Sequence, residues 1–497
     1  MKALKTLLLV TLVLFGTYAC TDATPESEGG QEPTPSRLWM PVFLSDGMVV
    51  QQNASAAFWG TTNPNATVTV EASWAEEGVT TKANAGGEWK VEIPTPAATF
   101  EPQCVMISDS HDGVKQIEDV LIGEVWHFAG QSNMEMPMKG NGSEAAGNYQ
   151  PVTGAFEEIA NCYSEFSHFR YFKVGRQSSK TPLKDAPNSK WWRVSNSLEA
   201  LEYSAIAFFC GRKLATELNV PIGIIGTCYG GSRIEAWMPA SRLNAFDPDD
   251  YKGVSDLTED TAVKNAPGVL YNAMINPVMP YVVRGWAWYQ GESNRDTSHS
   301  YARLQQAMVD EWRKAKGDTK AQMPFYYMQI SGIGGRSDEY GANLIQAQWD
   351  ALKLIPNSHI ITTSDVGDEE CIHYPNKKVP GERLANSILH NTYGRDDIKI
   401  APPQVRSVSY NGNKVVLSFV NGEGLHSTQA SIPYVQLLDS SGKLQTATAT
   451  IKSDGTMEIS SSKVTNPQGV RYCYISWHIS TVFNSAGIPL APYKHNK

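Results

Sequence analysis

The sequence predicts an α/β protein in which a mostly parallel sheet, covered by helices on both faces, is flanked by two β-rich regions. From residue 123 to about residue 400, apolar strand-like runs alternate with amphipathic helical runs, as in a parallel sheet with crossover helices. Before and after this region, short runs rich in β-branched and aromatic residues are separated by turn signals, without helical periodicity. The 497 residues are enough for about three domains of ~150 residues each.

The first twenty residues have the pattern of an export signal. A basic tip precedes an apolar run that is short for a bilayer span, and small residues then lead to Cys20. This resembles a bacterial lipoprotein signal, in which Cys20 would be lipidated. Residues 21–36 are acidic and rich in Pro, Gly and Ser, which predicts a flexible tether. We therefore expect export to the periplasm, outer membrane or cell surface, with membrane attachment only through a lipid on Cys20.

The remaining chain is predicted to form three domains. Residues 37–122 form a small β-sandwich, with strand-like runs at 48–52, 55–62, 65–74, 86–94 and 104–110. Residues 123–400 form the α/β domain, with strands within 123–129, 220–231, 285–294, 324–331 and 359–365 and helices at 204–218 and 301–317. Residues 401–497 form a second β-domain with a hairpin at 410–419.

Composition limits the partners. Hydrophobic residues make up 41% and charged residues 19%, which is typical of a globular protein. The formal net charge of −9 argues against nucleic acid as a partner. The seven cysteines show no CxxC pair and no metal-ligand spacing, so neither a metal nor another cofactor is expected.

Four polar clusters follow strands of the predicted parallel sheet, at 130–133 (GQSN), 226–232 (GTCYGGS), 289–294 (YQGESN) and 364–375 (SDVGDEECIHYP). Ligands bind beyond the carboxyl ends of such strands. Ester hydrolysis needs a nucleophile, a base and donors for the oxyanion, and Ser132 and His373 supply the first two. The backbone N–H groups of Ser132 and of Gly230 or Gly231 are candidate donors for the oxyanion. The side-chain amides of Gln290 and Asn294 are further candidates. An α/β-hydrolase elbow is disfavoured because Met134 stands where G-x-S-x-G needs its second Gly.

Long stretches resemble the sialate O-acetylesterase family of the SGNH hydrolases: MPVFLSDGMVVQQ (40–52), GEVWHFAGQSNMEMPM (123–138), VPIGIIGTCYGGSRIEAWMP (220–239), VLYNAMINPVMPYVVRGWAWYQGESN (269–294) and GDEECIHYPNKKVPGERLA (367–385). The resemblance implies a flavodoxin-like three-layer αβα domain with accessory β-domains. It also implies metal-free removal of O-acetyl groups from sugars through an acyl-serine, with O-acetylated sialic acids as the expected substrate. Ser132 would be the nucleophile and His373 the base, and Gly230 or Gly231 would build the oxyanion hole with a side chain from QGESN.

The residue that orients His373 is left open. SGNH hydrolases commonly place an Asp three residues before the His, where this chain has Glu370. Glu370 is therefore the predicted acid, while Asp368 and Asp365 are other carboxylates within reach of the same loop. A Ser–His dyad supported only by backbone carbonyls is a further alternative.

Other features have two interpretations. Arg233 could bind a substrate carboxylate through two hydrogen bonds or form a structural pair with Glu235. Cys228 and Cys371 lie beside the predicted site but have apolar neighbours, which favours structural thiols. The alternatives to a sialate esterase are an acetylxylan-type or other glycan deacetylase and, outside the enzymes, a glycan-binding surface lipoprotein.

Overall fold

The computed structural model describes residues 35–140, 151–162, 168–190, 192, 197–252, 263–334 and 339–497. The predicted export signal, Cys20 and nearly all of the predicted tether lie outside these residues. The segment Ser36–Lys497 forms one compact unit. In the described ranges, no helix combines the length and the hydropathy that crossing a bilayer requires.

Parallel strands form the central sheet, in the order β8 (Phe169–Lys173), β9 (Ile222–Cys228), β7 (Val114–Gly130), β10 (Gly285–Tyr289), β11 (Phe325–Met328) and β13 (Ser358–Ile361). The strands β9, β10 and β11 are buried along their whole length, as expected where helices cover both faces. After β7 the chain forms β8 and β9 on one side of that strand and then passes to β10 on the other side. The strand order therefore reverses at β7, and ligands of open α/β sheets bind at such a switch point.

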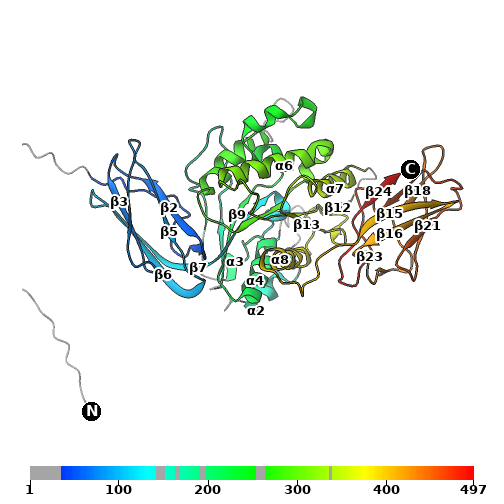
Figure 1. Ribbon diagram of the computed structural model, residues 1–497, viewed down its shortest axis with the longest axis horizontal. Coiled ribbons are helices and arrows are strands. Elements are labelled where there is room, and N and C mark those ends of the chain that lie inside the picture. Colours follow the sequence, from blue (N-terminus) through cyan, green and yellow to red (C-terminus); the bar gives the residue numbers. More distant parts are fainter. Residues whose placement is uncertain are drawn as a thin grey trace, which may run out of the picture. The chain divides into compact units, whose positions relative to one another are not determined.

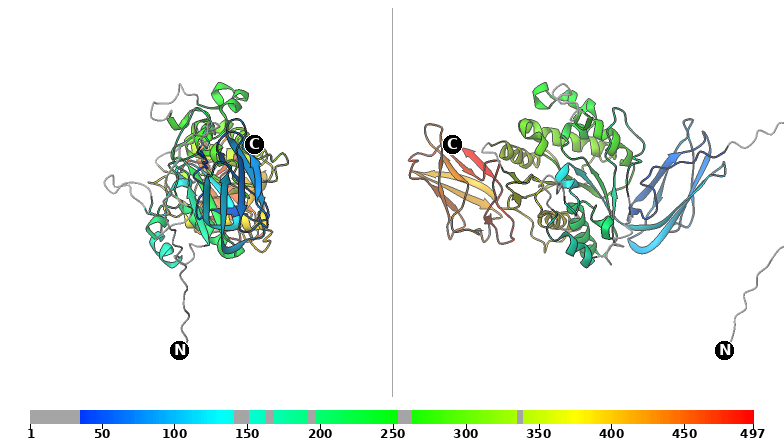
Figure 2. Two further views of the ribbon diagram at one scale, coloured as in Figure 1. Left: turned by 90° about the vertical axis from the view of Figure 1, so that its left-hand side faces the viewer. Right: turned by 180° about the vertical axis from the view of Figure 1, so that it is seen from behind.

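Helices cover both faces of this sheet (Figure 1). The helices α4 (Ala205–Leu218) and α8 (Lys378–Tyr393) lie on one face, and α6 (Ser298–Ala315) and α7 (Tyr340–Ala351) lie on the other. The view from behind shows the same three layers (Figure 2). The side chain of Ser204 caps α4 by accepting from the N–H of Ala207, and it donates to the carbonyl of Met134 at 2.6 Å. The predicted α/β class is confirmed.

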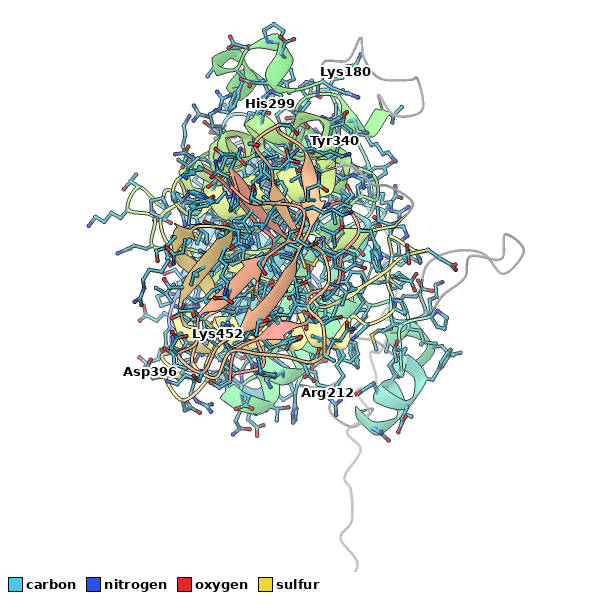
Figure 3. All side chains as sticks on the ribbon, turned by 90° about the vertical axis from the view of Figure 1, so that its right-hand side faces the viewer. Lys180, Arg212, His299, Tyr340, Asp396 and Lys452 are labelled. Atoms are coloured by element: carbon cyan, nitrogen blue, oxygen red, sulfur yellow. The ribbon has the colours of Figure 1, made fainter. Side chains whose placement is uncertain are left out.

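Shorter elements connect the layers. They are α1 (Ser132–Glu135), α2 (Ala155–Cys162), α3 (Ser197–Ala200), 3-10 turns at Ile234–Trp237, Ala240–Ala245, Pro248–Asp250, Asn276–Val278 and Glu292–Thr297, and a π turn at Tyr271–Ile275. A small sheet pairs β12 (Gly332–Ile333) with β14 (Gly367–Asp368). Charged side chains such as Lys180 and Asp396 are exposed on the surface of the molecule (Figure 3).

The N-terminal β-domain shares a strand with the central sheet. It pairs β2 (Ser55–Thr61) with β5 (Glu88–Pro94), and in its other sheet β4 (Val79–Lys82), β3 (Thr67–Ala72) and β6 (Thr99–Asp109) lead to the first half of β7. The short strand β1 (Val49–Gln51) runs parallel to residues 121–123 of β7. The second half of β7 belongs to the parallel sheet. The predicted domain boundary between residues 122 and 123 thus falls inside a continuous strand.

Hydrophobic side chains also join these two regions into one core. Phe43 is completely buried, and its ring packs against those of Trp59 at 5.5 Å and Phe172 of β8 at 6.2 Å between centroids. The indole N–H of Trp192 donates to the carbonyl of Phe43 at 2.8 Å. The segment before β1 is therefore part of the packing of the central domain.

The C-terminal β-domain has a core of its own, which includes Leu417, Leu437, Ile459 and Tyr472. One sheet has the order β15 (Gln404–Asn411), β16 (Lys414–Val420), β21 (Met457–Ser460) and β20 (Thr448–Ile451); the other has the order β19 (Leu444–Thr446), β18 (Val435–Leu438), β22 (Gly469–Tyr472) and β24 (Tyr493–Asn496). The strands β17 (His426–Ser427) and β23 (Val482–Phe483) form a separate pair. The hairpin of β15 and β16 lies where it is predicted.

Phe43→Ala is expected to destabilise the shared unit by about 3–5 kcal/mol, because it empties a fully buried aromatic site. Thermal unfolding should show one transition at a lower temperature. Phe100→Ala, in the same β-domain but with the side chain 36% exposed, is the matched control and should cost less. A weakened N-terminal transition beside an unchanged transition of the central domain would contradict the shared core.

Candidate active site

Ser132 lies at the end of β7, at the switch point of the sheet. Gly130 ends the strand with a φ of +146°, and a Cβ there would lie 2.2 Å from the carbonyl oxygen of Tyr289, so the close approach of β7 and β10 requires glycine. Ser132 follows as the first residue of α1 and is half-buried. In the described part of the chain, its hydroxyl has no hydrogen-bond partner. The hydroxyl is therefore available to a substrate.

The two amides that flank Ser132 tie this strand end to its neighbours. The side-chain oxygen of Gln131 accepts from the N–H groups of Gly291 and Ser293 at 3.3 and 3.4 Å. The amide of Asn133 donates to Glu292 at 2.6 Å and to the carbonyl of Ile372 at 3.2 Å. The polar run 130–133 thus joins the loop after β10 to the loop that carries His373.

His373 is half-buried in the loop between β14 and α8. Burial lowers the pKa of His373 below its usual value of 6.5, and the nearby Lys377 lowers that pKa further. The Lys377 amine donates to the Asn133 oxygen at 2.7 Å and lies 3.3 Å from the centroid of the Tyr374 ring. A neutral imidazole beside the strand end that carries Ser132 is the form that can accept a proton.

The candidate acids do not bond to His373 within the described ranges. Asp365 forms two hydrogen bonds to Arg383, at 2.9 and 3.0 Å. One oxygen of Asp368 accepts from the N–H groups of Glu370 and Cys371 at 2.9 and 3.0 Å, which closes a tight turn. The Glu370 side chain is exposed. Asp365 is therefore occupied elsewhere, and the orienting role of Glu370 or Asp368 stays a prediction beside the dyad.

The structure distinguishes between the predicted oxyanion donors. The N–H of Gly230 donates to the carboxylate of Glu135 at 2.8 Å, so it is already engaged. A Cβ on Gly230 would come within 3.4 Å of the Cβ of Ser132, which places this glycine against Ser132. The N–H groups of Ser132 and Gly231 have no hydrogen-bond partner in the described part of the chain, which leaves these two donors for an oxyanion.

Gln290 and Asn294 must be reassigned from oxyanion donors to structural support. Both are completely buried. The Gln290 amide donates to the carbonyl of Ser232 at 3.0 Å and to the Asn294 oxygen at 2.8 Å, which uses both of its N–H bonds. The Asn294 amide donates to the two oxygens of Glu235 at 3.1 and 3.0 Å. Gln290 therefore has no donor left for substrate, and Asn294 is completely buried against Glu235 and does not face one.

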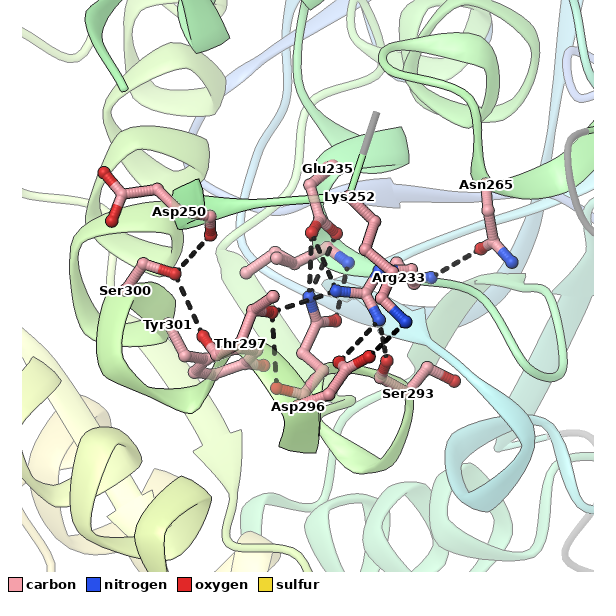
Figure 4. Close-up of polar contacts among 12 residues, drawn as sticks. Arg233, Glu235, Asp250, Lys252, Asn265, Ser293, Asp296, Thr297, Ser300 and Tyr301 are labelled. Carbon is pink, nitrogen blue, oxygen red and sulfur yellow. Dashed lines mark hydrogen bonds and ion pairs between the residues drawn. The ribbon is translucent and has the colours of Figure 1, made fainter. Parts of the chain in front are cut away.

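Arg233 is likewise structural (Figure 4). Its side chain donates to Glu235 at 3.2 Å, to Asp296 and Thr297 at 2.9 Å, and to the carbonyl of Ser293. The residue is only 5% exposed. The predicted contact with a substrate carboxylate is therefore replaced by the alternative, a pair with Glu235, because the terminal nitrogens already bind protein.

A different set of charged groups borders Ser132, and the sequence analysis missed it. Glu135, on the first turn after Ser132, accepts from the Nε of Arg176. The Lys264 amine donates to the carbonyl of Gly230 at 3.0 Å. Both cations lie 5.7 Å from the centroid of the Tyr229 ring. Arg176 and Lys264 lie outside the sequence motifs, so only the spacing of Glu135 from Ser132 could have hinted at this cluster.

The neighbouring thiols and indoles have structural surroundings. Cys228 is 6% exposed, and burial raises the pKa of its thiol well above the usual value of 9.0. Cys371 is a half-buried free thiol. The tryptophans beside the polar clusters are completely buried: Trp126, Trp237, Trp286 and Trp288. No group of three or more His, Cys, Asp or Glu side chains in the described ranges could hold a metal ion.

Comparison with known proteins decides the family. The model of the family described as "Carbohydrate esterase, sialic acid-specific acetylesterase" matches residues 123–390, more than half of the chain. The chain belongs to this family. It is therefore an SGNH-type carbohydrate esterase, a hydrolase of carboxylic esters, and the predicted resemblance is confirmed.

Relatives extend over most of the chain. The sialate O-acetylesterase of Homo sapiens is 26% identical over 408 residues, which cover 76% of this chain and 75% of the relative. That of Mus musculus is 26% identical over 449 residues, 81% of this chain and 77% of the relative. The crystal structure of a carbohydrate acetylesterase from Xanthomonas citri superposes with a TM-score of 0.80 at 30% identity, covering 92% of this chain and 99% of that one. The similarity to this esterase thus includes the accessory β-regions.

Arg233→Ala is expected to destabilise folding by about 3–5 kcal/mol, because it leaves the fully buried Glu235 without its cationic partner. Thermal unfolding of the purified variant measures this loss. A variant of normal stability whose KM rises only for acidic sugars would restore the substrate-binding role.

Proposed function

We propose that this carbohydrate esterase removes O-acetyl groups through an acyl-serine intermediate, with Ser132 as the nucleophile and His373 as the base. One observation carries the proposal. Ser132, whose hydroxyl has no hydrogen-bond partner among the described residues, is followed by Asn133, and the amide of Asn133 donates to the carbonyl of Ile372, the residue before His373. The geometry thus supports a nucleophile and a base on adjoining segments.

In the first step, His373 takes the proton of Ser132 while the oxygen attacks the acetyl carbonyl. The N–H groups of Ser132 and Gly231 stabilise the oxyanion. Collapse breaks the ester bond, the sugar hydroxyl leaves with the proton from His373, and the acetyl group stays on Ser132. Water, deprotonated by His373, then attacks the acyl-serine and releases acetate.

O-acetylated sialic acid is the proposed substrate. The description of the family and the names of the mammalian relatives support it. An acetylated xylan is the main alternative, and acetate release from a panel of O-acetylated glycans distinguishes the two. A clear preference for acetylated xylan would replace sialic acid as the substrate.

We also propose that the chain is exported and anchored through Cys20. The support is the sequence of the first twenty residues, with a basic tip, an apolar run and a Cys. Cys20→Ser should release the protein from the membrane fraction without changing its specific activity, and an unchanged fractionation would contradict the anchor.

Ser132→Ala is expected to lower kcat/KM by about 10³-fold or more, since no other group in the proposed mechanism forms the acyl intermediate. Folding should not change, because the hydroxyl has no hydrogen-bond partner among the described residues. Ser293→Ala is a matched control, since Ser293 is also half-buried beside the site. Residual activity above half, with normal thermal unfolding, would remove Ser132 from the mechanism.

The pH dependence tests the base. His373 must be neutral to accept the proton, so kcat/KM should fall as the pH drops through its pKa. Because burial and Lys377 hold that pKa below 6.5, the acid limb of the profile should be centred below pH 6.5. Lys377→Met should move this limb to higher pH, whereas Lys378→Met, which removes a surface partner of Glu158, should not. A wild-type limb above pH 6.5 would argue against this role.

A further inference from the structure

Two cations, Arg176 and Lys264, lie beside the proposed nucleophile and contact the ring of Tyr229. Tyr229 follows β9, is half-buried, and its N–H donates at 3.0 Å to the carbonyl of Gly130, two residues before Ser132. The Arg176 guanidinium carbon and the Lys264 nitrogen each lie 5.7 Å from the centre of its ring. Lys264 is also bonded to Gly230, the glycine that lies against Ser132, so this pair of cations borders the site.

Both cations keep hydrogen-bond donors for a ligand. Arg176 uses its Nε for Glu135, and its side chain is 57% exposed. Its two terminal nitrogens have no partner in the described part of the chain. The Lys264 amine donates to the carbonyl of Gly230, which leaves further N–H bonds, since an ammonium has three.

The charge balance of the cluster is positive. Glu135 is the carboxylate paired with Arg176, and Lys264 has no carboxylate partner among the described residues. Two other cations near the site are less available to a ligand, because the terminal nitrogens of Arg233 bind protein and Lys377 is completely buried. Arg176 and Lys264, by contrast, keep donors that can meet an anion from solvent.

We propose that Arg176 and Lys264 bind the carboxylate of an acidic O-acetylated sugar and hold its ester against Ser132. The guanidinium edge left free by Glu135 can form two parallel hydrogen bonds with a carboxylate, and the Lys264 amine adds a third. The inference rests on the proposed role of Ser132 and names the residues that would select an acidic substrate. Sialic acids and uronic acids carry the same group, so the test includes both.

The decisive comparison uses matched substrates. O-acetylated sialic acid and its methyl ester differ in the charge of the carboxylate, whereas an aryl acetate lacks the sugar altogether. For the wild-type enzyme, KM should be about tenfold higher for the methyl ester than for the free acid, with kcat little changed. Acetylated polygalacturonate shows whether a uronic acid is accepted equally well.

Lys264→Met is the first variant, because it leaves the pair of Arg176 and Glu135 in place. Its KM for the free acid should rise about tenfold. Its KM for the methyl ester should not change, because the substitution and the esterification remove the same interaction between the Lys264 amine and the carboxylate. Arg176→Lys keeps a charge without the planar fork and should weaken binding of the acid alone. Lys180→Met, at an exposed lysine on the surface, is the control and should behave as wild type.

Each contrary result has one meaning. A wild-type enzyme that treats free acid and methyl ester alike overturns the carboxylate site but leaves the esterase mechanism intact. A Lys264→Met enzyme that is equally impaired on the aryl acetate shows that Lys264 only positions Gly230, which also overturns the inference. Retention of activity by Ser132→Ala is a separate failure, that of the proposed function.

Discussion

Asn133 is completely buried, and its amide holds together the three segments that meet at the site. It joins the end of β7 to Glu292 after β10 and to Ile372 and Lys377 before α8. A buried amide must be hydrogen-bonded, and here two of its three partners are ionisable groups. Burial raises the pKa of Glu292 and lowers that of Lys377, and the hydrogen bond from Asn133 opposes the rise at Glu292. The positions of Ser132 and His373 follow from these hydrogen bonds, because each is the sequence neighbour of a bonded residue.

A second constraint is the continuity of β7. The strand leaves the N-terminal β-domain and becomes the central strand of the parallel sheet. The antiparallel sheet of the N-terminal β-domain therefore supports the strand whose carboxyl end leads to Ser132. The C-terminal β-domain supports the opposite loop, since the N–H of Ser480 donates to the carbonyl of Ser364 at 2.7 Å. Ser364 begins the loop that carries His373. The accessory domains therefore support both segments that meet at Asn133.

The sequence was sufficient to predict where the strands of the parallel sheet end. It was not sufficient to predict which groups the polar side chains at these ends bind. Periodicity and the rule for parallel sheets located the polar clusters, and these meet around Ser132 as expected. The same clusters also contain side chains that form hydrogen bonds with buried polar groups of the loops. The spacing of residues in the sequence does not distinguish these structural side chains from those that face substrate. Gln290 and Asn294 were predicted to face substrate, and this was one of two interpretations of Arg233, but all three bind groups up to 64 residues away in the chain. Their direction depends on tertiary packing.

The electrostatics of the site are consistent with the proposal that this acidic protein binds an anionic sugar. The net charge of −9 is spread over the chain, and at physiological ionic strength charges beyond about 8 Å are largely screened. Capture then depends on groups close to the bound anion. Glu135 neutralises one of the two nearby cations, yet this pairing also fixes the guanidinium, because Glu135 is held by the N–H of Gly230. A fixed, planar donor loses less conformational freedom on binding than a mobile surface cation. In the proposed site, the Glu135 carboxylate therefore reduces the local charge but improves the geometry with which Arg176 would bind an anion.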